Sequence, residues 1–172
     1  AILDQDELEI SEVFDLTPGA DPAGDPNNAV SQRLRRLATE AEALAGKSVK
    51  HDVSVPIPAI PDFLQAAEQA LAAQGVRINC FGHLGDGNLH YNLQAPAGSD
   101  GAAFLREQES TVNDIVYDGV QARGGSISAE HGIGQLKRDS LADRKSPVAL
   151  QLMRAIKQAL DPRGLFNPGR VL

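Results

Sequence analysis

Two histidines seven residues apart flank a glycine-rich turn in the segment FGHLGDGNLHYN, residues 81–92. His83 precedes the turn and His90 follows it, so a hairpin would bring the two imidazoles toward each other. Two neutral imidazoles suit a zinc-like divalent ion, which needs a further nitrogen or oxygen ligand. A surface hairpin whose histidines only make turn hydrogen bonds would show the same spacing, so both interpretations stay open at this point.

A second glycine-flanked segment, AEHGIG at 129–134, offers the missing ligand. Glu130 could complete the set, and His131, pointing the other way in an extended chain, would remain as a base beside the ion. Such a base can take the proton of a metal-bound hydroxyl, whose acidity the cation raises. The alternative is a solvated loop pair. Because three of the four histidines in the chain lie in these two segments, a site is favoured.

The segment after the turn, NLHYNLQ at 88–94, reads as a strand with one polar and one apolar face. The polar set is Asn88, His90 and Asn92, and the apolar set is Leu89, Tyr91 and Leu93. In SVKHDVSVPI, residues 48–57, the same alternation places His51 among valines and Lys50 on the polar side. We therefore expect His51 to be a packed residue, with the polar sides of both strands available to the site.

The elements that must position these residues follow from apolar periodicity and from glycine and proline punctuation. We expect helices at about 28–45, 60–75, 101–125 and 146–160, strands at 48–57, 76–83 and 88–94, and a short strand at 126–134. Strands and helices mix without strict alternation. This order predicts an α+β fold, with an antiparallel sheet and helices on one face, of ferredoxin-like type.

Composition excludes several classes of protein. The net charge of −7 argues against a binder of nucleic-acid backbones. One cysteine, Cys80, excludes an internal disulfide and a cysteine-rich zinc site. The sequence has no apolar run long enough to span a bilayer and begins with acidic residues, so a reducing, cytoplasmic compartment is expected. Residues 1–28, rich in acidic residues, proline and glycine, are expected to form an arm or a truncated element.

Three motifs in order, HLGDGNLHYN, AEHGIG and DPRGLFNPGR, resemble the carboxyl-terminal part of a flavoenzyme family. The family is that of the FAD-linked 2-hydroxy-acid dehydrogenases and oxidases of the vanillyl-alcohol-oxidase type, with D-lactate, glycolate and D-2-hydroxyglutarate dehydrogenases as members. The resemblance implies that residues 29–172 are a substrate- and metal-binding cap domain. It places the FAD-binding domain outside this chain, whose glycine-rich stretches lack the strand-to-helix context of a phosphate-binding loop.

The resemblance also assigns roles to single residues. The implied metal ligands are His83, His90 and Glu130, the implied base is His131, and the implied substrate contacts are Arg35, Thr39, Lys50 and Asn92. Arg35 and Thr39 are also one helical turn apart, and an arginine fork with a lysine charge suits a carboxylate; the alternative is a solvated basic face. Asn167 in the FNPGR tail is expected either to touch the flavin or FAD domain or simply to form a turn.

The resulting hypothesis is an FAD-dependent enzyme that oxidises a D-2-hydroxy acid to a 2-oxo acid with a bound divalent metal, zinc being expected. Its implied partners are the small 2-hydroxy-acid substrate, the FAD-binding domain, an unknown electron acceptor and a possible homodimer. Two alternatives remain from the residues alone. One is a metal-dependent hydrolase that uses the same side chains, and the other is a non-catalytic α+β interaction module.

Overall fold

The computed structural model describes residues 47–172. The chain divides into two compact units, of which the first ends at Ala129 and the second is Glu130–Leu172. The expected helix at 28–45, with Arg35 and Thr39, lies outside the described residues, as does the expected arm at 1–28.

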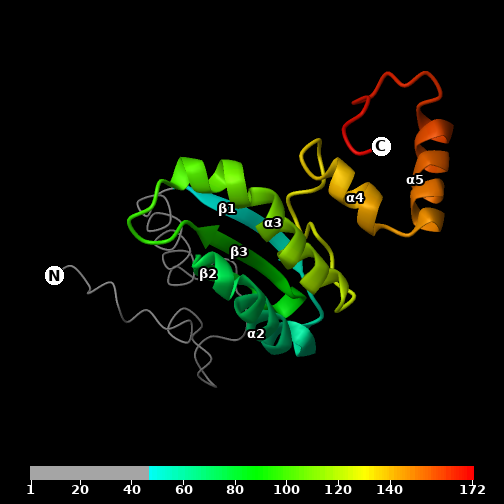
Figure 1. Ribbon diagram of the computed structural model, residues 1–172. Coiled ribbons are helices and arrows are strands. Elements are labelled where there is room, and N and C mark those ends of the chain that lie inside the picture. The colour runs from blue at the N-terminus through cyan, green and yellow to red at the C-terminus, as the bar shows by residue number, and fades with distance from the viewer. Residues whose placement is uncertain (1–46) are drawn as a thin grey trace, which may run out of the picture. The chain divides into compact units, whose positions relative to one another are not determined.

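The first unit is built on a three-stranded antiparallel sheet (Figure 1). Its strands are β1 (Ser48–Ser54), β2 (Arg77–His83) and β3 (Asn88–Gln94), and their order in the sheet is β1-β3-β2. Helix α2 (Ile60–Leu71) lies in the chain between β1 and β2, and α3 (Gly101–Gln121) follows β3. The predicted α+β class is confirmed, and the chain order β1-α2-β2-β3-α3 is that of a ferredoxin-like fold.

One face of the sheet carries the core, because alternate residues of β1 and β3 are buried and, apart from His51, apolar. The apolar residues are Val49, Val53, Leu89, Tyr91 and Leu93. Helix α2 contacts this face through Phe63, whose ring centre lies 5.5 Å from that of Tyr91. Helix α3 contacts it through Tyr117, whose ring centre lies 5.4 Å from that of His51. The predicted placement of both helices on the apolar face is therefore confirmed.

His51 belongs to this core, as its place among the valines predicts. Its side chain is buried, with 1 % of its surface exposed. Nδ1 donates to the carbonyl oxygen of Tyr91 at 2.8 Å, and Nε2 lies 2.8 Å from Oδ1 of Asn113 on α3. Both ring nitrogens thus have partners inside the protein, which is the usual condition for burying a histidine.

Cys80 also faces the core, from β2, opposite Tyr91. Burial raises the pKa of its thiol to about 12, because the charged thiolate would lose its hydration. The thiolate is the nucleophile and metal ligand, so Cys80 is a packing residue and takes no part in the chemistry of the site.

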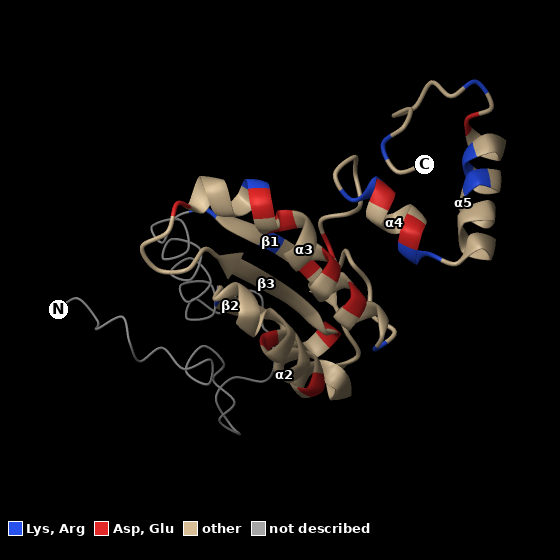
Figure 2. Ribbon diagram, viewed as in Figure 1, with Lys and Arg blue, Asp and Glu red and all other residues tan. Residues whose placement is uncertain are grey.

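Acidic side chains prevail on the two helices that cover the sheet (Figure 2). They are Asp62 and Glu68 on α2 and Glu107, Glu109, Asp114 and Asp118 on α3, against a single basic residue, Arg106. A phosphate backbone would be repelled from this layer. None of the described helices is both long and apolar enough to cross a bilayer.

Two predictions for the second half of the chain need correction. The expected strand at 126–134 is reduced to a single bridge between Ser126 and Ser54. The backbone turns soon afterwards, where Gly132 has a φ of 80°. Helix α4 (Arg138–Arg144) was not expected, because seven residues are too few to show a clear helical period.

The second unit contains α4, α5 (Pro147–Leu160) and the tail 161–172. Ser146 caps α5 as predicted, since its side chain accepts a hydrogen bond from the N–H of Ala149 at 3.2 Å. The start of α3 follows the same rule. Asp100 accepts from Ala102 and Ala103 at the start of α3, and these bonds lower its pKa.

Asp161 organises the tail that follows α5. Its carboxylate accepts hydrogen bonds from Nζ of Lys157 (2.6 Å) and from the N–H groups of Leu165 (2.8 Å) and Phe166 (2.9 Å). The Lys157 bond, followed by the backbone bonds, lowers the pKa of Asp161 to about 2. The FNPGR tail thus begins from a fixed carboxylate.

We expect this tail to loosen only in strong acid. In the folded protein the pKa of Asp161 lies below its ordinary value of 3.8. The ionised carboxylate therefore stabilises the tail at pH values above 3.8, and this stabilisation is lost as the pH falls toward 2. Amide chemical shifts of Leu165 and Phe166, followed by NMR, should therefore move together with a midpoint below 3.8. Asp161→Asn should abolish this titration. A midpoint at or above 3.8 in the unmodified chain would contradict the assignment.

Candidate active site

The face of the sheet opposite the core is polar and gathers several predicted site residues. On β3 the polar face carries Asn88, His90 and Asn92, as the period of two predicts, and His90 and Asn92 are the predicted site residues among them. In the register of β1 against β3, Lys50 pairs with Asn92 and Asp52 pairs with His90. Directly paired residues of an antiparallel sheet have Cβ atoms about 4.5–5.5 Å apart. Two predicted substrate contacts, one on each strand, are therefore neighbours.

Burial differs between these neighbours. Lys50 is exposed, whereas Asn92 has only 3 % of its surface exposed. His90 is half-buried, and its ring lies against that of Phe81 on β2, with 5.1 Å between ring centres. Phe81 pairs with His90 in the register, so this contact limits the orientations that the imidazole can take.

His83 reaches the same face at the end of β2. It pairs with Asn88, which makes it a diagonal neighbour of His90, at a spacing that long or aromatic side chains can bridge. The hairpin between them closes through a short 3-10 turn, Leu84–Asp86, and Gly87. Gly87 has a φ of 76°, and a Cβ added there would lie 2.1 Å from the carbonyl oxygen of Val55, so a side chain does not fit.

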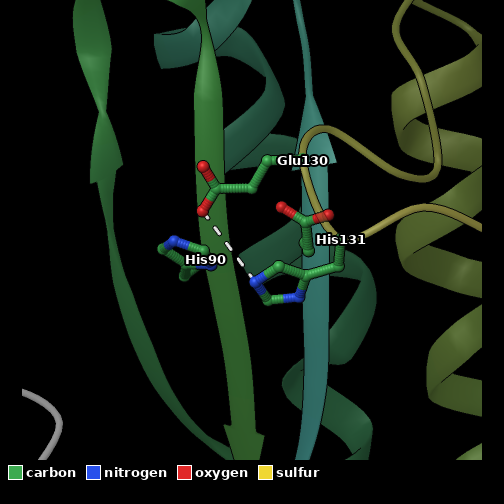
Figure 3. Close-up of side chains that lie close together, drawn as sticks. His90, Glu130 and His131 are labelled. Atoms are coloured by element: carbon green, nitrogen blue, oxygen red, sulfur yellow. Dashed lines mark ion pairs between the residues drawn. The ribbon is translucent and has the colours of Figure 1, made fainter.

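Four side chains with metal-ligating atoms form a close group among the described residues. They are Asp52, His90, Glu130 and His131, and one ligating atom of each lies within 4.8 Å of the others. Figure 3 shows the imidazole of His90 with the carboxylate of Glu130 and the ring of His131. Nε2 of His131 lies 3.8 Å from Oε1 of Glu130. Both side chains are exposed. In the chain, Glu130 and His131 are the first two residues of the second unit.

This group overlaps the predicted ligand set without matching it. His90 and Glu130 are common to both. His83 is not among the four grouped residues, and Asp52 joins them although it was not expected. The sequence does contain a signal for Asp52, since it alternates with Lys50 on the polar side of β1. Its role was missed because alternation alone does not show which strand lies beside β3.

The donor atoms of the group fit a divalent ion of the zinc type. Imidazole nitrogen and carboxylate oxygen bind zinc at about 2.0–2.2 Å, so two ligands of one ion are at most about 4.4 Å apart. The observed limit of 4.8 Å exceeds this by little, and two of the four side chains, Glu130 and His131, are exposed. The residues thus fit a metal, while its identity stays a prediction.

Asn167, the predicted flavin contact, lies in the second unit. It is exposed, it has a φ of 47°, and its carbonyl oxygen accepts a hydrogen bond from the N–H of Arg170 at 3.3 Å. These features describe a tight turn. Contact of Asn167 with a flavin stays a prediction.

Comparison with known proteins places the motifs in a family. Residues 2–171 match the model of the family described as FAD linked oxidases, C-terminal domain. The chain belongs to this family. The resemblance carried by the motifs at 83–92, 129–134 and 161–170 is thereby confirmed.

Curated relatives of this FAD-linked oxidase domain are dehydrogenases. It is 41 % identical over 124 residues to the D-2-hydroxyglutarate dehydrogenase of Stutzerimonas stutzeri (strain A1501), covering 71 % of the chain and 26 % of the relative. It is 38 % identical over 139 residues to the mitochondrial D-2-hydroxyglutarate dehydrogenase of Bos taurus, covering 81 % and 24 %. It is 39 % identical over 158 residues to the D-2-hydroxyglutarate dehydrogenase of Xanthomonas citri pv. viticola, covering 91 % and 33 %. The matched regions span about a quarter to a third of these relatives.

Proposed function

We propose that the full-length protein containing this chain is an FAD-dependent dehydrogenase that oxidises D-2-hydroxyglutarate, or a closely similar D-2-hydroxy acid, to the 2-oxo acid. The observation that carries the proposal is the arrangement of the polar sheet face. There, the Lys50–Asn92 pair adjoins the Asp52–His90 pair, and Glu130 and His131 lie beside His90. Family membership and the names of the three relatives support this choice of reaction and substrate.

The substrate carboxylate would be bound at the Lys50 side of this face. Lys50 is exposed and supplies a compact positive charge. The amide of its neighbour Asn92 can donate a hydrogen bond to a substrate oxygen. Arg35 and Thr39, which lie outside the described residues, remain proposed partners of the carboxylate.

The hydroxyl at C2 would lie at the His90 side. His83, His90 and Glu130 would hold the divalent ion, which when bound raises the acidity of the substrate hydroxyl. His131 would accept the hydroxyl proton. Its exposed imidazole lies next to Glu130, with 3.8 Å between Nε2 of His131 and Oε1 of Glu130.

The oxidation removes a hydride from C2 as the hydroxyl proton leaves, and a C=O double bond forms. FAD, held mainly by an FAD-binding domain elsewhere in the full-length protein, supplies the acceptor for that hydride. Asn167 is proposed to touch the flavin or that domain. The acceptor that reoxidises the flavin, a homodimer and a cytoplasmic location stay predictions.

A substrate panel on the full-length, FAD-loaded protein tests the proposal. We expect dye reduction with D-2-hydroxyglutarate at a higher kcat/KM than with D-lactate or glycolate, and little with L-2-hydroxyglutarate. Faster turnover of D-lactate would leave the reaction type standing and overturn the choice of substrate. Absence of dye reduction with every D-2-hydroxy acid would overturn the function.

A further inference from the structure

The segment that carries Glu130 and His131 is attached by backbone hydrogen bonds to β1, on the edge that faces away from β3. The N–H of Ser54 donates to the carbonyl oxygen of Ser126 at 2.9 Å, and the N–H of Ser126 donates back to Ser54 at 2.8 Å. Gly125 permits this approach, because a Cβ there would lie 2.1 Å from the carbonyl oxygen of Ser54. Residues 126–129 thus take the place of a fourth strand of the ferredoxin-like order.

Asp52 holds the far end of this segment. The N–H of Ala129 donates both to the backbone oxygen of Asp52 (3.2 Å) and to its Oδ2 (3.1 Å). The hydroxyl of Ser128 also donates to Oδ2, at 3.3 Å. Asp52 has 3 % of its surface exposed, so these bonds lie in surroundings where water competes little. Hydrogen bonds to an ionised carboxylate are also stronger than neutral ones.

We propose that Asp52 is the positioning residue for the segment 126–129, which leads directly into Glu130 and His131. It is suited to this role because it pairs with His90 in the sheet and bonds Ala129, the residue just before Glu130. A single residue of β1 therefore contacts both β3 and the segment 126–129. The proposal rests on the proposed function for its effect on turnover, whereas the attachment of the segment is independent of that function.

The expected effect follows from how steeply catalysis depends on geometry. A displacement of about 1 Å at a reacting group can cost about 100-fold in rate. Without the Asp52 carboxylate, Ala129 keeps only its bond to the backbone oxygen, so Glu130 and His131 gain freedom. We expect Asp52→Ala to lower kcat by about 100-fold and to change KM less.

The test compares three variants of the full-length, FAD-loaded protein with the unmodified enzyme. Asp52→Ala removes the side-chain oxygen that accepts hydrogen bonds from Ser128 and Ala129. Asp52→Asn keeps a side-chain carbonyl oxygen that can accept them, so its kcat should be close to that of the unmodified enzyme. Ser54→Ala is the matched control on the same side of β1, because the hydrogen bonds between Ser54 and Ser126 are made by backbone atoms. Thermal unfolding of each variant identifies any that fails to fold.

Hydrogen exchange measured by mass spectrometry supplies a readout apart from turnover. In Asp52→Ala, amides of 126–131 should exchange faster, while those of β3 should exchange as in the unmodified protein. Asp52→Asn and Ser54→Ala should leave both segments protected. Because exchange needs no substrate, this comparison tests the attachment even if the full-length protein oxidises no D-2-hydroxy acid.

Two results would overturn the proposal. The first is an unchanged exchange rate at 126–131 in a folded Asp52→Ala variant. The second is Asp52→Asn losing as much kcat as Asp52→Ala while 126–131 stays protected, because the carboxylate charge, and not its position as an acceptor, would then be what the site needs. Loss of kcat in Asp52→Ala with faster exchange, and recovery of both in Asp52→Asn, would support it.

Discussion

His131→Ala in the full-length, FAD-loaded protein should lower kcat for D-2-hydroxyglutarate oxidation by about 10²–10⁴-fold, the usual contribution of a general base. His131 is the proposed acceptor of the hydroxyl proton, and its imidazole has 62 % of its surface exposed. Truncating so exposed a side chain removes few packing contacts, so the loss should fall on turnover while the melting temperature changes little. Steady-state dye reduction and thermal unfolding measure the two quantities.

A base that is deleted can be replaced in part by a small base from solution. Added imidazole should therefore raise the kcat of His131→Ala and leave the unmodified enzyme unaffected. Gln135→Ala is the matched control, since Gln135 is an exposed residue of the same segment, four positions further on. A kcat of His131→Ala within about tenfold of the unmodified enzyme would be below the range for a general base and would exclude this role.

Removal of the divalent ion is the second change with a large expected effect. Dialysis of the full-length protein against a strong chelator should abolish most D-2-hydroxyglutarate oxidation, and zinc or another borderline divalent ion should restore it. His90→Ala should prevent this restoration, because His90 is one of the two ligands shared by the predicted set and the observed group. Elemental analysis and dye reduction on the same samples link metal content to rate.

His83→Ala and Asp52→Asn separate the two ligand sets. If His83, His90 and Glu130 hold the ion, His83→Ala should lower metal content as His90→Ala does, whereas Asp52→Asn should retain it. If Asp52→Asn instead loses the metal and His83→Ala retains it, Asp52 is a metal ligand and His83 is not. Full activity after rigorous chelation would remove the ion from the reaction, although the dehydrogenase proposal would remain.

The faces of the strands could be predicted from the sequence, because side-chain alternation is a local property. The alternation correctly placed His90 and Tyr91 on opposite faces of β3 and His51 in the core. Helix α5 was predicted for a similar reason, since Ser146 and Pro147 mark its start within a few residues.

The order in which the strands pair could not be predicted from local sequence patterns. Lys50 faces Asn92, and Asp52 faces His90, only because β1 lies beside β3 and not beside β2. That order depends on how α2 and α3 cross the sheet, which involves contacts far apart in the chain. The role of Asp52 in holding Ala129 is of the same kind, because the two residues are 77 positions apart.

The central claim, that the full-length protein removes a hydride from a D-2-hydroxy acid, is tested most directly by single-turnover flavin reduction. D-2-Hydroxyglutarate is mixed without oxygen with the FAD-loaded protein, and flavin absorbance and the 2-oxo acid are measured together. We expect flavin reduction with one 2-oxo acid formed per flavin, and slower reduction in His131→Ala. An oxidised flavin after prolonged mixing with D-2-hydroxyglutarate, D-lactate and glycolate would contradict the claim.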